Sequence, residues 1–293
     1  MKDASHRDFL SEASLLAAVF FLGTNPVAVK YAILEIPPLV FVALRFTLAG
    51  LLLWTFRKAV GAREPLGARE LLRMAGVGAF GVGLNNVLFT LGVSMTSASE
   101  TALIYATPPL WGMLLGFLLG QERPTKRGVT GVAIAMVGVT VVVSGGMGSA
   151  APSFAGDLLV MCGAVCWGAY TVLGMRLLRR HPPLTVAAYT TLSGGLATLP
   201  LGALSFFRSS GGHPGGLVWA AVAYSTFLVA AYGFFAWQRG IFRLGANRVL
   251  VYQYLITLVG VISGILALGE RLGPAQIIGG AVILAGVFAA RKQ

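Results

Sequence analysis

The stretch "LLGQERPTKRG" at residues 118–128 returns near the end of the chain as "LALGERLGPAQ" at residues 266–276. In both places a Glu-Arg pair follows a long apolar run and precedes a glycine-rich one. Charged residues make up only 11% of the 293 residues, so composition alone does not account for the same pair in the same setting twice. Duplication of a structural unit is therefore the first hypothesis for the fold.

Aligning Glu122 with Glu270 without gaps brings other identical residues together. In this and a neighbouring register the pairs include Gly92 with Gly240, Ala98 with Ala246, Leu110 with Leu258, Gly112 with Gly260, Gly116 with Gly264, Gly131 with Gly279, Gly138 with Gly286, Gly23 with Gly168, and Pro37-Pro38 with Pro182-Pro183. The repeat predicts two similarly built halves, residues 1–145 and 146–293.

The apolar residues fall into runs that match the thickness of a bilayer. They make up 56% of the chain, the mean hydropathy is +0.80, and an apolar run of about 20 residues is what a helix needs to cross a membrane. The predicted spans are 12–32, 37–56, 71–93, 97–119, 128–144, 156–177, 184–206, 216–237, 246–268 and 275–290. We therefore predict an all-α membrane protein with ten transmembrane helices. Because each half has an odd number of spans, the halves form a 5+5 inverted repeat.

The net charge of +12 is distributed as a topology signal. Almost all of the Lys and Arg residues fall on the side of the two termini, and the loops of the other side hold only Arg208 and Arg271. The positive-inside rule places both termini in the cytoplasm of an inner (plasma) membrane protein. The expected partners are the lipid bilayer and a small-molecule substrate, with no nucleic acid, and the chain is expected to be a monomer.

Several longer motifs resemble the EamA-type branch of the drug/metabolite transporter superfamily. In the first half they are "LGTNPVAVKYA" (22–32), "ALRFTLAG" (43–50) and "TALIYATPPLWGMLLGFLLGQERPTKRGVTGVAIAMVGV" (101–139). The second half repeats them as "CWGAYTVLGMRLL" (166–178) and "RVLVYQYLITLVGVISGILALGERLGPAQIIGGAVILAGV" (248–287). The resemblance implies a ten-helix exporter of small metabolites, nearest to the bacterial aromatic amino-acid exporters.

Two departures from the family pattern separate the halves. Leu22 precedes Gly23 where the family often has Trp, although Trp167 keeps that position in the second half. Ile256-Thr257 occupies the region of the ninth span where the family often has Pro. The halves are therefore not expected to move symmetrically.

Ionisable residues inside a membrane are functional candidates by default. Lys30 or Arg45 could receive a substrate carboxylate. The alternatives are snorkelling for Lys30 and an ion pair between either residue and Glu100 or Glu35. The neutral polar and aromatic candidates are either substrate-lining or interhelical packing residues. These substrate-site candidates are Asn85, Asn86, Thr101, Tyr105, Trp167, Tyr170, Tyr232, Tyr252 and Gln253. Trp237, near a predicted span end, is instead assigned to an interfacial belt with Trp54 and Trp219.

Prolines within the spans are candidate hinges. Pro108 and Pro109 fall in the middle of the fourth span and remove two amide donors, so Ile104 and Tyr105 lose their usual helical partners. Pro26 has the same effect in the first span. We predict a sharp bend near Tyr105–Pro109 and a smaller one in the ninth span; a static kink is the alternative.

The sequence lacks the residues that an enzyme or a metal site would need. The three histidines lie in tails or loops, and Cys162 and Cys166 are read as inert core residues. No cofactor, metal or catalytic residue is predicted.

We predict a secondary transporter that exports small metabolites, and amino acids with aromatic or apolar side chains are the first candidates. It would work by alternating access at a midplane cavity, with facilitated transport or coupling to the membrane potential because no carboxylate lies at mid-span. The alternatives are a sugar-phosphate or nucleotide-sugar carrier and a non-transporting membrane scaffold.

Overall fold

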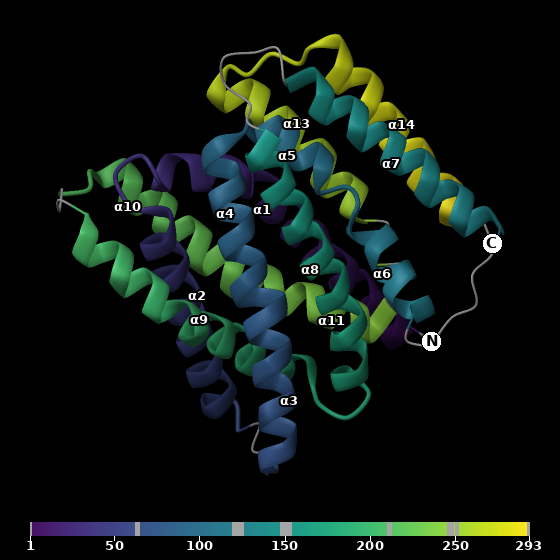
Figure 1. Cartoon of the computed structure of the whole chain (residues 1–293). Helices are drawn as coiled ribbons and strands as arrows, with labels where there is room; N and C mark the ends of the chain where they lie inside the picture. Colours follow the sequence, from purple (N-terminus) through teal and green to yellow (C-terminus); the bar gives the residue numbers. More distant parts are fainter. Residues whose placement is uncertain are drawn as a thin grey trace.

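The computed structural model describes residues 2–61, 65–118, 126–146, 154–209, 213–244, 249 and 252–291, and this part of the chain is helical without strands (Figure 1). The helices are α1 (Lys2–Ala32), α2 (Pro38–Ala59), α3 (Ala68–Gly78), η1 (Ala79–Leu84), α4 (Asn85–Met95), α5 (Ala98–Ile104), α6 (Pro108–Leu118), α7 (Lys126–Gly146), α8 (Phe154–Leu178), α9 (Pro183–Arg208), α10 (Gly216–Ala223), η2 (Tyr224–Gly233), α11 (Phe234–Leu244), α13 (Tyr252–Leu268) and α14 (Pro274–Arg291).

These helices make the chain a multi-pass membrane protein. Eight helical stretches of the described residues are long and apolar enough to cross a membrane, and the ninth and tenth predicted spans hold two shorter apolar helices, Tyr252–Leu268 and Pro274–Gly286. Matching prolines start two of the long helices, since Pro38 opens α2 and Pro183 opens α9. Proline suits the first helical turn because the amide it lacks has no partner there.

The third and eighth spans each contain a π-helical segment. The third runs as α3, η1 and α4, and the eighth as α10, η2 and α11. Such segments are uncommon and are frequently found at functional sites. The hydropathy pattern carried no signal for them.

The fourth span is interrupted at the place where a sharp bend was predicted. Helix α5 ends at Ile104, α6 begins at Pro108, and the residues between them are not helical, whereas α13 is continuous. The carbonyl of Ile104 does not stay unpaired, as the amide and hydroxyl of Thr107 donate to it at 3.1 and 2.8 Å. Pro108 and Pro109 therefore occupy the first turn of α6, which tolerates proline, and not the interior of a bent helix.

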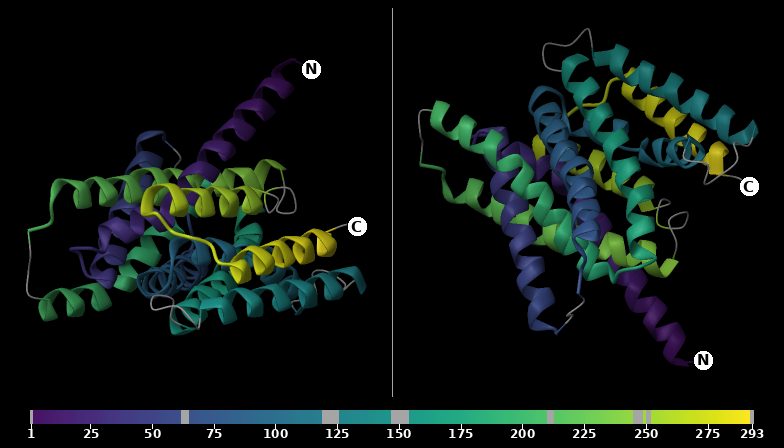
Figure 2. Two further views of the ribbon diagram at one scale, coloured as in Figure 1. Left: turned by 90° about the horizontal axis from the view of Figure 1, so that it is seen from above. Right: turned by 60° about the horizontal axis from the view of Figure 1, so that its bottom comes forward.

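Close glycine contacts join α7 to α14, and these contacts are reciprocal. A Cβ on Gly138 would lie 2.7 Å from the carbonyl oxygen of Gly279, and one on Gly286 would lie 2.7 Å from that of Gly131. The pairs run in opposite directions along the two helices, which are therefore antiparallel. The pair lies at one side of the bundle in both views of Figure 2.

Helices α2 and α9 pack in the same manner and lie side by side in Figure 1. A Cβ on Gly50 would meet the backbone of Leu192, and one on Gly195 would meet the backbone of Thr47. Here too the contacts run antiparallel. The small residues thus allow backbone-to-backbone approach, the usual way for membrane helices to associate.

Candidate functional site

A cavity of about 60 Å³ lies between helices of both predicted halves. Its lining is mostly apolar, with four side-chain amides, two hydroxyls and one guanidinium. The lining residues are Leu22, Gly23, Asn25, Pro26, Arg45, Asn85, Asn86, Phe89, Ala102, Tyr105, Trp167, Val229, Phe234, Gln253, Ile256 and Thr257. This volume is enough for a few water molecules.

Arg45 is the one cationic residue of this lining. It sits two turns into α2, its side chain is 1% exposed, and within the described part of the chain it has no hydrogen bond or ion pair. The guanidinium lies 4.6 Å from the ring centroid of Phe46 and 5.6 Å from that of Phe41. Aromatic faces attract a cation but leave its N–H donors unused. A buried guanidinium with free donors beside a cavity is suited to bind a carboxylate in a bidentate manner.

Among the described residues no ion pair joins Arg45 or Lys30 to Glu100 or Glu35, although Lys30 lies within electrostatic reach of Glu100 and Glu270. Glu100 accepts from Thr96, Ser97 and Gln276, and Glu35 accepts from the backbone amide of Gly215. Lys30 donates to the backbone carbonyl of Thr96. Arg45 therefore remains available on the cavity wall, whereas Lys30 belongs to a separate polar cluster at one end of the bundle.

The two asparagines of α4 are anchored by hydrogen bonds. Asn85 Nδ2 donates to the carbonyl of Gly163 at 3.1 Å, and its Oδ1 accepts from the Tyr105 hydroxyl at 3.0 Å. Asn86 Nδ2 donates to the carbonyl of Val82 at 2.9 Å. Both side chains are buried. Asn85 therefore has both of the roles considered for it: it packs between helices by joining α4 to α8, and it also lines the cavity.

The side chain of Gln253 bonds to the backbone at the break in the fourth span. Its Nε2 donates to the carbonyl of Tyr105 at 2.8 Å, the group that the prolines leave without a helical partner. Its Oε1 is buried and has no hydrogen-bond partner among the described residues. The sequence alignment of the halves pairs these same two positions, so the contact joins equivalent points of the repeat.

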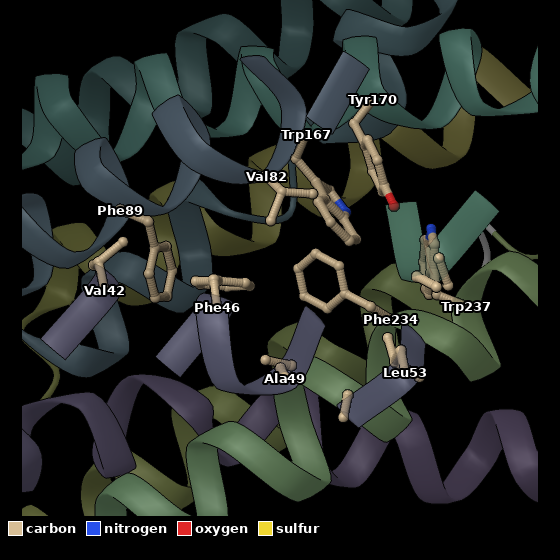
Figure 3. Close-up of a cluster of buried hydrophobic side chains, with 14 of the residues drawn as sticks. Val42, Phe46, Ala49, Leu53, Val82, Phe89, Trp167, Tyr170, Phe234 and Trp237 are labelled. Atoms are coloured by element: carbon tan, nitrogen blue, oxygen red, sulfur yellow. The ribbon is translucent and has the colours of Figure 1, made fainter. Parts of the chain in front are cut away.

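A cluster of aromatic side chains lies between the helices (Figure 3), and the Arg45 guanidinium packs on one of its rings, that of Phe46. Trp167 and Phe234 line the cavity with ring centroids 5.1 Å apart. Tyr170 stacks on Trp167 with ring centroids 5.3 Å apart, and the Trp237 ring lies 5.7 Å from that of Trp167. Trp237 is fully buried, so its assignment to an interfacial belt is wrong. The helix continues to Leu244, which places Trp237 two turns inside the helix end.

Other predicted residues lie away from the cavity lining. Tyr170 is fully buried and its hydroxyl pairs with Thr190 at 3.0 Å. Thr101 donates to the carbonyl of Ser97, and Tyr232 hydrogen-bonds to Ser14. The remaining residues of this group are Tyr252, which packs against the hydrophobic core, and Pro108 and Pro109, which are buried at the start of α6. Pro26, in contrast, lies on the cavity wall.

Nine lining residues were not among the predicted site residues: Leu22, Gly23, Asn25, Phe89, Ala102, Val229, Phe234, Ile256 and Thr257. Asn25 Oδ1 accepts a hydrogen bond from the Ser225 hydroxyl at 3.0 Å. Asn25 precedes Pro26 in the motif at residues 22–32 that resembles the EamA-type pattern, so the sequence did contain a reason to consider Asn25 as a site residue. Whether Phe89 and Phe234 point into the cavity depends on the rotation of their helices about the helix axis, which hydropathy does not define.

The Glu-Arg element of the second half ties distant segments together. Glu270 Oε1 accepts from the amide of Ala98 at 2.7 Å, and its Oε2 accepts from the amide of Ser99 at 2.8 Å. These amides open α5, so one carboxylate caps the start of the broken fourth span. The equivalent Glu122 lies outside the described residues.

Membrane-length helices enclosing a small amphipathic cavity with one unpaired cation define a membrane transporter. Comparison with known proteins agrees with this class. The EamA-like transporter family model matches residues 10–144 and again residues 154–291. The chain therefore belongs to the EamA-like transporter family, and this membership indicates a transporter rather than an enzyme.

Individual relatives are similar over most of their length. The chain is 29% identical to "Uncharacterized transporter YyaM" of Bacillus subtilis, covering 94% of this chain and 92% of the relative. It is 30% identical to "Probable terminal-alkyne amino-acid exporter" of Streptantibioticus cattleyicolor, covering 85% and 82%, and 24% identical to "Probable amino-acid metabolite efflux pump" of Salmonella typhimurium, covering 93% and 92%. A crystal structure with 22% identity superposes with a TM-score of 0.67 over 96% of both chains, so the fold is shared.

Proposed function

We propose that the protein is a secondary transporter that exports small carboxylate-bearing metabolites through the Arg45 cavity. Amino acids with apolar or aromatic side chains are the favoured substrates. The observation that carries this proposal is the buried guanidinium of Arg45, which lines the cavity and has no hydrogen-bond or ion-pair partner among the described residues. An unpaired buried charge is costly, and a substrate carboxylate would offset that cost.

The rest of the lining favours an amino acid over a phosphorylated sugar. A phosphate group with two negative charges would call for several cationic side chains, and Arg45 is the only one in the lining. The rings of Trp167, Phe234 and Phe89 provide an apolar surface for a flat side chain. The printed names of two relatives, an amino-acid exporter and an amino-acid metabolite efflux pump, add support for this class.

Alternating access between two inverted halves is part of the proposal. The family model matches the chain twice. The reciprocal contacts of Gly138 with Gly279 and of Gly286 with Gly131 involve residues that the repeat alignment pairs with one another. Reciprocal contacts are characteristic of a two-fold relationship, and the antiparallel direction of the helices supports its inversion.

The proposed location is the inner (plasma) membrane with both termini in the cytoplasm, on the strength of the basic residues. Single cysteines in place of Asp3 and Lys292, in a background without Cys162 and Cys166, should resist an impermeant thiol reagent in intact cells. A cysteine in place of Ser149 should react. Labelling of either terminus would overturn this topology.

The carboxylate site is tested by transport in proteoliposomes. Arg45→Gln should lower uptake of L-phenylalanine by about 10- to 100-fold, because a charge-assisted hydrogen bond contributes about 1.5–3 kcal/mol. Lys30→Gln is the matched control and should retain uptake, since Lys30 bonds to a backbone carbonyl away from the cavity. Equal losses for both variants would refute the assignment of Arg45. Absence of uptake by the parent protein across a panel of amino acids and sugar phosphates would favour the scaffold alternative.

A further inference from the structure

Besides the Arg45 guanidinium, the cavity lining contains another unpaired polar group, the Oε1 of Gln253. The side chain is 1% exposed, and this oxygen has no hydrogen-bond partner among the described residues. A buried acceptor without a partner costs about 1–3 kcal/mol, so its presence in a cavity wall calls for an explanation. We propose that Gln253 Oε1 accepts an N–H of the substrate, which makes it the amine-binding group of the site; this rests on the proposed carboxylate site at Arg45.

The amide of Gln253 can face the substrate only with its oxygen. Its other end is held by the backbone carbonyl of Tyr105, which only accepts hydrogen bonds, so the atom that meets it at 2.8 Å must be Nε2. Pro109 keeps this carbonyl free, because an ordinary residue there would donate its amide to Tyr105 as in a continuous helix. The proline break in the fourth span therefore orients an acceptor on the ninth.

Two of the three other side-chain amide oxygens of the lining, those of Asn85 and Asn25, already accept a hydrogen bond; the third is Asn86 Oδ1. Asn85 Oδ1 accepts from the Tyr105 hydroxyl, and Asn25 Oδ1 accepts from Ser225. No Asp or Glu is among the lining residues. A substrate ammonium would thus be recognised by a neutral carbonyl oxygen together with the faces of Trp167 and Phe234, which attract cations without an N–H contact.

This arrangement assigns the two charged ends of an amino acid to different helices. The carboxylate would bind Arg45 on α2, in the first predicted half, and the amine would bind Gln253 on α13, in the second. The contact between Gln253 and Tyr105 joins the same two halves. A substrate with both groups would bridge them, whereas a simple carboxylic acid would bind one side only.

Binding of two matched ligands to the purified full chain tests the proposal. L-Phenylalanine and 3-phenylpropionate share the ring and the carboxylate, and only the first has the amine. Calorimetry on the parent protein should give a preference of about tenfold for phenylalanine. Gln253→Met, which keeps the length of the side chain, should reduce this ratio to about one. Arg45→Gln should weaken both ligands together.

The ratio separates substrate recognition from damage to the fold. If Gln253→Met leaves the ratio of the two affinities unchanged, whether or not both ligands bind more weakly, Gln253 has a structural role and the proposal is overturned. Failure of the parent protein to bind either acid would instead remove the Arg45 site, and this inference with it. Preferential loss of phenylalanine binding, with 3-phenylpropionate unaffected, is the supporting result.

A measurement on the parent protein avoids the variant altogether. The N,N,N-trimethyl derivative of phenylalanine keeps the positive charge and the carboxylate but has no N–H to donate. It should bind about tenfold more weakly than phenylalanine if Gln253 Oε1 accepts a hydrogen bond. Equal binding of the two would show that aromatic faces alone recognise the amine and would overturn the proposal.

Discussion

The fourth and ninth spans occupy the same place in the predicted repeat but differ in backbone. The fourth is divided into α5 and α6, while α13 runs unbroken from Tyr252 to Leu268. Their packing is nevertheless alike, since Gly168 packs on the carbonyl of Pro108 and Gly23 packs on that of Ile256, the equivalent residue. The difference therefore comes from the prolines and not from the neighbouring helix. It leaves the carbonyl of Tyr105 without its helical backbone donor, and the side-chain amide of Gln253 on the continuous helix bonds to it instead.

The largest expected effect follows from introducing the break into the continuous span. Ile256→Pro removes the amide that bonds to Tyr252 within α13 and places a ring against the preceding turn, at a cost of about 3 kcal/mol or more. Thermal unfolding in detergent and folded yield should both fall well below the parent values. Ile256→Ala is the control, because it shortens the same side chain and retains the amide. Equal stability of the two variants would mean that a continuous ninth span is not required.

Methyl groups at the two equivalent glycines should be the next most damaging change. A Cβ on Gly23 would lie 2.6 Å from Val259 Cβ and 2.8 Å from the carbonyl oxygen of Ile256. A Cβ on Gly168 would lie 2.7 Å from the carbonyl oxygen of Pro108. Overpacking of this kind costs about 1–3 kcal/mol. We expect Gly23→Ala to cost more, because α6 begins at Pro108 and its free end can shift, whereas α13 has no such end at Ile256.

The control for the glycine pair is Gly76→Ala on α3. Nothing lies within 4 Å of a Cβ at this position, and alanine is favoured over glycine in a helix by about 0.5–1 kcal/mol. This variant should therefore unfold at an equal or higher temperature than the parent. If Gly168→Ala proves more damaging than Gly23→Ala, the free end of α6 does not give way as argued.

Loss of the Glu270 cap should have a smaller effect, confined to the broken span. Glu270→Gln keeps the shape but replaces one carboxylate oxygen with a donor that faces an amide of α5, at a cost of about 1–2 kcal/mol. Hydrogen exchange at Ala98 and Ser99 should accelerate. Glu35→Gln is a suitable comparison, because Glu35 accepts a single backbone bond, from Gly215, at an exposed site. Unchanged exchange at both amides would remove the capping role.

Much of this comparison could be predicted from the sequence. Hydropathy predicted where the helices lie, since burial in lipid requires long apolar runs, and Pro108-Pro109 predicted the interruption. The partner of the free carbonyl was not predicted, because Gln253 is 148 residues away from Tyr105 along the chain and a tertiary contact has no local pattern. The repeat alignment did pair the two positions, so the signal was present without a reason to interpret it as a contact.

The candidate site was predicted less completely, because it depends on which way each helix faces. Arg45 and Trp167 were found from their chemistry, as a charge and a large ring are conspicuous in a membrane span. Phe234 was missed and Tyr232 was chosen in its place, two residues away on the same span. The π-helical segment η2 ends at Gly233, between these two residues, and a change in helical period rotates every later side chain. Periodicity arguments that assume 3.6 residues per turn fail at such a point.

The smallest effect on stability, and the most informative one on motion, is expected from restoring amides to the broken span. Pro109→Ala supplies an N–H that can reach the carbonyl of Tyr105 and compete with Gln253, whereas Pro108→Ala supplies one towards Ile104, whose carbonyl already accepts from Thr107. Both variants should stay within about 1 kcal/mol of the parent, because alanine is well tolerated in helices.

The Tyr105 carbonyl has no helical backbone donor, and this could allow the fourth span to flex during alternating access. In that case Pro109→Ala should slow turnover several-fold with little change in apparent affinity, and Pro108→Ala should slow turnover less. Initial rates and saturation constants for L-phenylalanine, measured in proteoliposomes at matched protein content, distinguish the two quantities. Parent-like turnover in Pro109→Ala would make these prolines a static feature of the fold. A rise in the saturation constant without a change in turnover would instead place the effect on Gln253, through the loss of its Tyr105 anchor.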